Sequence, residues 1–92
     1  MQETRIRVTG EIDERLAGRL RAQLLIEIDA SDGDLLVDCS AVPFLDSDGL
    51  MPLLDAQHVL MSRNRKLVLV NLHEVPRRKL ELLGLDEYLT GG

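Results

Sequence analysis

The stretch Leu35–Leu50, LLVDCSAVPFLDSDGL, contains the transition that decides the fold. It begins with Leu35–Val37, a short apolar run without alternation, which is typical of a strand buried on both faces in a parallel sheet. It ends in DSDG, where Asp46 or Ser47 can cap the free backbone N–H groups of a helix and Gly49 allows a tight turn. We therefore predict a buried strand, a loop and a helix in that order.

Two further strand patterns lie on either side of this stretch. Arg5–Thr9 alternates polar and apolar residues, and Gly10 ends the pattern. Lys66–Val70, KLVLV, is the clearest strand pattern in the chain. A weaker strand pattern is present near Tyr88–Thr90.

The segments between these strands have helical patterns. Asp13 can cap a helix whose apolar residues share one face because they recur at every fourth position, namely Leu16, Leu20, Leu24 and Ile28. The helix that starts near Ser47 is expected to end at about Arg63. Pro76 suits the first turn of a third helix, which Gly84 would end. The second and third helices are expected to face the core with Leu50, Leu53, Leu54, Leu60, Met61, Leu80, Leu82 and Leu83.

The order of these elements predicts an α/β fold. Strands alternate with helices as β-α-β-α-β-α-(β), so we expect one domain, residues 1–92, with a mostly parallel sheet of about four strands and three helices. In such a sheet the loops that follow the strands gather at one end, where ligands and partners usually bind. Those loops are Gly10–Glu11, Ser40–Asp46 and Asn71–Glu74.

Composition excludes several classes of protein. The chain has 11 basic and 16 acidic side chains and a net charge of −5, whereas nucleic-acid binders usually present a basic face. Its apolar runs are too short to span a membrane, and it does not open with a secretory signal. A single cysteine, Cys39, cannot form an internal disulfide and fits a reducing compartment. These features predict a cytoplasmic protein that binds no nucleic acid and does not insert into a membrane.

The sequence contains no pattern that predicts catalysis, a metal or a cofactor. His58, His73 and Cys39 lie in different segments without metal-ligand spacing, and no nucleophile elbow or nucleotide-binding loop is present. The basic clusters Arg63–Lys66 and Arg77–Lys79 are short and lie near acidic residues, which favours solvated surface over an anion site. We expect a protein that is not an enzyme.

Ser47 allows two interpretations. In the first, the DSDG segment only caps a helix. In the second, a serine at an exposed helix N-terminus, on the binding end of the sheet, is a target for phosphorylation, because the helix dipole and free N–H groups can accept a phosphate without unfolding the domain.

Three stretches of this chain resemble the STAS domain family, and within it the bacterial anti-sigma factor antagonists. Val8–Asp13 (VTGEID) is similar to the family's strand that ends in TGELD. Leu36–Ser40 and Phe44–Leu50 resemble its strand and its DSSGL helix start. Lys66–Leu72 and Val75–Leu85 resemble its final strand and helix. Together these stretches cover nearly the whole chain.

The resemblance implies a partner-switching regulator. Such proteins bind an anti-sigma factor that is also a serine kinase and thereby free a sigma factor for transcription. The kinase phosphorylates the serine after the motif's aspartate, which corresponds to Ser47, and a phosphatase reverses the modification. The implied docking surface comprises Glu11, Asp13, Asp46, Asp48 and Gly49.

The chain departs from the family pattern at several points. Asp48 replaces the second motif serine, so a negative charge is always present beside Ser47. The STAS-like fold is expected to be trimmed at both ends, and self-association as a homodimer is one way to cover the apolar surface that this would leave. These departures motivate an alternative function, namely a STAS adaptor without phosphate control, for example in a bacterial lipid-transport ABC complex. Direct binding of a nucleotide or small anion is a third interpretation.

Overall fold

The computed structural model describes residues 3–91 and confirms the α/β fold. The three strands are parallel and lie in the order β1-β2-β3. The elements along the chain are β1 (Thr4–Thr9), α1 (Glu14–Ala30), β2 (Leu35–Ala41), α2 (Ser47–Met61), β3 (Leu67–Val70), α3 (Glu74–Leu83) and α4 (Asp86–Thr90).

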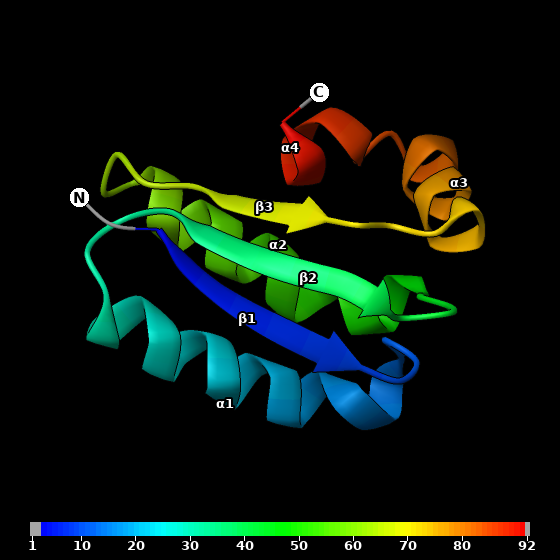
Figure 1. Ribbon diagram of the computed structural model, residues 1–92, viewed down its shortest axis with the longest axis horizontal. Coiled ribbons are helices and arrows are strands. Elements are labelled where there is room, and N and C mark those ends of the chain that lie inside the picture. Colours follow the sequence, from blue (N-terminus) through cyan, green and yellow to red (C-terminus); the bar gives the residue numbers. More distant parts are fainter. Residues whose placement is uncertain (1–2, 92) are drawn as a thin grey trace.

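Helices α1 and α2 cover one face of the sheet (Figure 1). Residues of the strands that point toward these helices are fully buried, as are the apolar residues that α1 and α2 turn toward the sheet. The core consists mainly of Ile6, Val8, Leu20, Leu24, Ile28, Leu35, Val37, Cys39, Leu50, Leu53, Leu60, Leu67 and Leu69.

The opposite face of the sheet carries no helix among residues 3–91, and here the sequence prediction was wrong. In β2, Leu36 and Asp38 are only half-buried, whereas Leu35 and Val37 on the helix side are fully buried. The run of apolar residues therefore does not require burial on both faces. Leu36 pairs laterally with Arg5 of β1 and Val68 of β3, which shield it in part.

The predicted last strand near Tyr88–Thr90 is the short helix α4. Leu85 and Leu89 are four residues apart, so a helix places both on the face that packs against the core. Gln57 of α2 fixes this helix, because its side-chain amide donates to the carbonyl oxygens of Leu67 (2.8 Å) and Tyr88 (2.6 Å).

Three apolar side chains expected in the core are exposed. Leu82 is 85% exposed, and Leu83 and Met61 are also largely accessible. In α3 the buried face consists of Pro76 and Leu80, which are four residues apart, and Leu82 lies on the opposite side of the helix.

One residue of the predicted basic surface is buried. The Arg65 guanidinium donates to the carbonyl oxygens of Gly33 (2.8 Å) and Ile28 (3.1 Å) and to Ser31 Oγ (2.9 Å). Arg65 therefore closes the C-terminal end of α1 by satisfying backbone acceptors that the helix leaves unpaired. The prediction that Arg65 belongs to a solvated surface was therefore wrong.

Candidate functional site

Two loops meet at the end of the sheet where the strands have their carboxyl ends. Ile12 and Leu45 form an isolated parallel bridge. The Ile12 N–H donates to Phe44 O at 2.9 Å, and the Asp46 N–H donates to Ile12 O at 3.0 Å. Backbone hydrogen bonds, which depend little on side-chain identity, thus hold the loop before α1 against the loop before α2.

Gly49 allows this close approach. It is buried in the first turn of α2, and a Cβ atom built there would lie 2.3 Å from Ile12 O and 2.6 Å from Asp13 N. Both are backbone atoms, which cannot move aside as a flexible side chain can. The sequence prediction of a tight turn at Gly49 therefore differs from its role here, because this glycine is helical and makes room for the neighbouring loop.

Ser47 is the first residue of α2 and is exposed. Asp46 precedes it as the N-cap, and its carboxylate accepts a hydrogen bond from the Gly49 N–H at 2.9 Å. Asp48 follows it in the first turn and is also exposed, where its negative charge is favourable to the helix dipole. The hydroxyl of Ser47 forms no hydrogen bond with any residue that the structure describes, so it is accessible to a partner.

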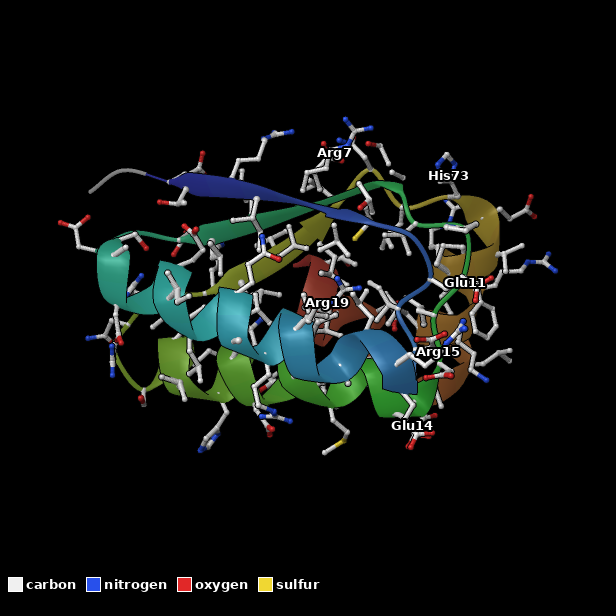
Figure 2. The ribbon with its side chains drawn as sticks, turned by 90° about the horizontal axis from the view of Figure 1, so that it is seen from below. Arg7, Glu11, Glu14, Arg15, Arg19 and His73 are labelled. Atoms are coloured by element: carbon white, nitrogen blue, oxygen red, sulfur yellow. The ribbon has the colours of Figure 1, made fainter. Side chains whose placement is uncertain are left out.

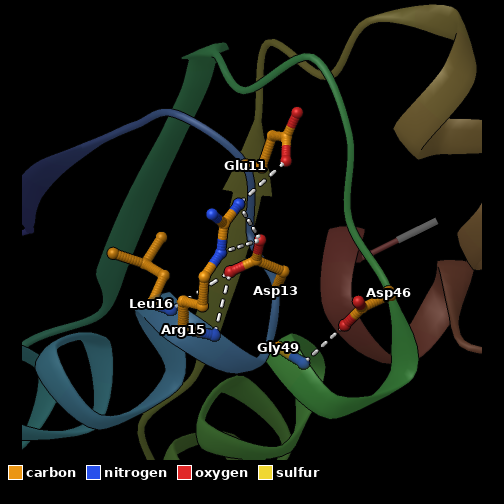
Figure 3. A network of polar contacts seen from close by, with 6 residues as sticks. All are labelled: Glu11, Asp13, Arg15, Leu16, Asp46 and Gly49. Atoms are coloured by element: carbon orange, nitrogen blue, oxygen red, sulfur yellow. Dashed lines mark hydrogen bonds and ion pairs between the residues drawn. The ribbon is translucent and has the colours of Figure 1, made fainter.

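Glu11 and Asp13 lie on the adjoining loop, with Arg15 between them (Figure 3). Asp13 caps α1 by accepting hydrogen bonds from the backbone N–H groups of Arg15 (3.0 Å) and Leu16 (3.2 Å). The Arg15 guanidinium donates to the same carboxylate at 2.9 Å and lies 3.6 Å from Glu11. The hydrogen bonds from this guanidinium hold the pKa of Asp13 below its ordinary value. Arg15 therefore partly neutralises the negative charge of Glu11 and Asp13.

Sequence reasoning missed two apolar residues that accompany Ser47. Phe44 is 41% exposed and Met51 is 48% exposed. Met51 lies four residues after Ser47 and so shares its face of α2, which the spacing alone could have indicated. Aromatic and methionine side chains are enriched at protein interfaces, so these two are candidates for contact with a partner.

The third loop at this end of the sheet forms a separate polar cluster. The Asp38 carboxylate accepts hydrogen bonds from the Ser40 N–H (3.0 Å) and the Asn71 side-chain amide (3.1 Å), and these lower the pKa of Asp38. His73 Nε2 lies 2.6 Å from Ser40 O and donates to it. Since a backbone carbonyl occupies this nitrogen, the arrangement is suited to fixing the loop before α3.

Chemistry at the remaining candidates is limited. Cys39 is fully buried in β2, and burial raises the pKa of its thiol to about 12, so little thiolate forms at neutral pH. Within residues 3–91 no group of three or more His, Cys, Asp or Glu side chains could hold a metal ion. In the same part of the chain, no helix is both long and apolar enough to cross a membrane.

Comparisons with known proteins agree with this fold. A family model described as the STAS domain matches residues 3–91. A sulfate transporter family protein from Wolinella succinogenes superposes with a TM-score of 0.81 at 21% identity, over 97% of this chain and 72% of that one. The anti-sigma factor antagonist SpoIIAA, in its unphosphorylated form, superposes with a TM-score of 0.67 at 20% identity, over 90% of this chain and 74% of that one. A search of curated proteins found no match.

Proposed function

Because this chain belongs to the STAS domain family, we propose that it acts as an anti-sigma factor antagonist in the cytoplasm. It binds an anti-sigma factor that is also a serine kinase, and this binding frees a sigma factor for transcription. The likeness of its fold to that of an anti-sigma factor antagonist supports this choice within the family. The protein acts by docking, and the surface that docks comprises Glu11, Asp13, Asp46, Asp48 and Gly49 around Ser47.

The observation that carries the proposal is the exposed hydroxyl of Ser47 on a rigid base. Ser47 begins a helix of 15 residues, and its neighbours are fixed by the Asp46 cap and by the backbone bonds to Ile12. A kinase can therefore reach the hydroxyl without unfolding a helix. The exposed Phe44 and Met51 beside it offer apolar contacts to the same partner.

Phosphorylation of Ser47 would change the surface more than the fold. The helix dipole favours an anion at this position by about 0.3–1 kcal/mol. Each of the adjacent aspartates, at a separation of about 5 Å, opposes the phosphate by about 1–3 kcal/mol per unit charge. The backbone bonds between the two loops do not involve the serine hydroxyl. Since about 1.4 kcal/mol lost at an interface lowers affinity tenfold, the phosphate would release a partner that docks on this surface.

A phosphorylation experiment tests the proposal. The chain is mixed with the anti-sigma factor kinase of its own organism and ATP, and intact mass is measured. Wild type should gain one phosphate, and Ser47→Ala should gain none. Ser40→Ala is the matched control, because Ser40 is also exposed but lies at the end of β2. A tight complex without phosphate transfer would contradict phosphate control, and the absence of a complex would contradict the antagonist function.

Asp48 favours a second candidate function. It occupies the position of the second serine in the family's motif and keeps a permanent charge beside Ser47. Such a surface suits a STAS adaptor without phosphate control, for example a subunit of a bacterial lipid-transport ABC complex. One structural neighbour is described as a sulfate transporter family protein. Co-purification with a transporter ATPase, and none with a kinase-like anti-sigma factor, would favour this candidate.

A further inference from the structure

The two edges of the sheet differ in how they are covered. At one edge α4 packs against β3, and Gln57 bonds to both. At the other edge no strand or helix of residues 3–91 pairs with the outer side of β1. The N–H groups of Thr4 and Gly10 donate toward β2. Because backbone groups alternate along a parallel strand, those of Arg5, Arg7 and Thr9 point outward.

A groove runs along this edge between β1 and α1. One part is a hollow of about 220 Å³ lined by Arg7, Thr9 and Leu16 among others, and the next is a hollow of about 490 Å³ that extends toward Glu11. Thr9, Leu16 and Arg19 line both parts, which makes the groove continuous. It therefore combines outward backbone groups with a half-buried apolar floor at Leu16.

Arginines border this groove beside β1, although the protein as a whole is acidic and Glu11 and Asp13 line the far end of the groove. Arg7 is exposed on β1 and points to the face of the sheet opposite the helices, whereas Arg19 is exposed on α1 (Figure 2), and neither forms an ion pair with another residue of the described part of the chain. Arg5 continues the row along β1, with a distant contact of 3.9 Å to Asp38. The net charge of the chain is −5, so these three cations form a local exception. They are complementary to carboxylates.

We propose that the β1 edge binds an extended, acidic segment of a partner protein, which adds to the sheet as a fourth strand. The backbone of this segment pairs with the outward groups of Arg5, Arg7 and Thr9, which is the mode of strand addition seen at exposed sheet edges. Because successive side chains of a strand point to opposite faces, carboxylates on the segment meet Arg5 and Arg7 on the open face of the sheet, and its apolar side chains cover Leu16 on the face of α1. The inference is independent of the phosphorylation of Ser47.

The charges also argue against a second copy of this chain as the occupant. Pairing β1 with β1 would bring arginines opposite arginines, and like charges in directly opposed positions destabilise a strand pair. Charged side chains on an edge strand discourage such self-pairing. An acidic partner removes the repulsion.

A peptide titration tests the proposal. The probe is a capped peptide as long as β1, six residues, that alternates glutamate and valine. In ¹H–¹⁵N NMR spectra of the full chain, its addition should shift the amide signals of Arg5, Arg7 and Thr9 most. Arg5→Gln and Arg7→Gln should each lower the affinity about two- to fivefold, the effect expected of an exposed ion pair. Arg78→Gln on α3 is the matched control and should leave it unchanged.

A second variant separates strand addition from simple charge attraction. Thr9→Pro keeps every arginine but removes an outward N–H, a change that edge strands tolerate. It should weaken binding of the glutamate peptide while the circular dichroism spectrum stays that of wild type. Equal affinity for a glutamine–valine peptide, or no shift of the β1 signals at millimolar glutamate peptide, would overturn the proposal. Self-association of the free chain through β1 would also overturn it.

Discussion

Replacing Gly49 with alanine should destabilise the fold, although the same change usually strengthens a helix. Alanine is favoured over glycine in a helix interior by about 1 kcal/mol. At Gly49, however, the new Cβ would lie 2.3 Å from Ile12 O, so either α2 or the loop at Ile12 must move. Overpacking of this kind costs about 1–3 kcal/mol. The displacement also strains the two backbone bonds that join Ile12 to Phe44 and Asp46, each of which contributes about 1 kcal/mol. We expect a net loss of about 2–4 kcal/mol in the free energy of unfolding.

The chain contains a matched control for this substitution. Gly18 lies in α1, and a Cβ atom there would have nothing within 4 Å. Gly18→Ala should therefore stabilise the protein by up to about 1 kcal/mol. Urea denaturation followed by circular dichroism gives both values. If Gly49→Ala were as stable as wild type, or if both variants shifted stability in the same direction, the close approach of the two loops would not be what fixes glycine at this position.

Three further substitutions or conditions test other parts of the structure. Arg65→Met leaves buried carbonyl acceptors unpaired and should lower the free energy of unfolding, measured by urea denaturation, by about 2–4 kcal/mol. The control Lys66→Gln should change this free energy by at most about 0.5 kcal/mol. Arg15 lowers the pKa of Asp13 in the folded state, so ionised Asp13 stabilises the fold fully at pH values above its ordinary pKa of 3.8. This stabilisation is lost as the pH falls through the lower pKa of the folded state. Asp13→Asn removes the titrating group and should therefore flatten the acid side of a curve of unfolding free energy against pH. Since burial raises the pKa of Cys39 to about 12, a thiol reagent at pH 7 should label it in urea but hardly at all in native buffer.

Much of the fold could be predicted because local patterns and the final structure agree. Asp13 and Asp46 cap α1 and α2 where the sequence places them, and Gly84 ends α3 in the left-handed conformation that glycine adopts readily. The spacing of apolar residues in α1 identified its buried face from Leu20 to Ile28. These signals are local, and each is carried by a few neighbouring residues.

The errors concern features that depend on what packs against a segment. The run Leu35–Val37 has the same residues whether its second face is covered or open, so the sequence could not tell that, within residues 3–91, helices cover only one face of the sheet. Arg65 looks like a surface residue because its partners, the carbonyls of Gly33 and Ile28, lie more than 30 residues away. Leu89 was placed in a strand, but a helix buries it together with Leu85.

The candidate site separates the residues that shape it from those that a partner would contact. Gly49 and the backbone of Ile12 set the distance between the two loops, and Asp13 and Asp46 hold the helix starts. The side chain of Ser47 contributes no hydrogen bond to this frame within residues 3–91. A change at its hydroxyl therefore alters charge at the surface and leaves the supporting bonds in place. A binding surface built in this way can be modified without breaking the hydrogen bonds that support it, which is a physical requirement for a switch that acts through affinity.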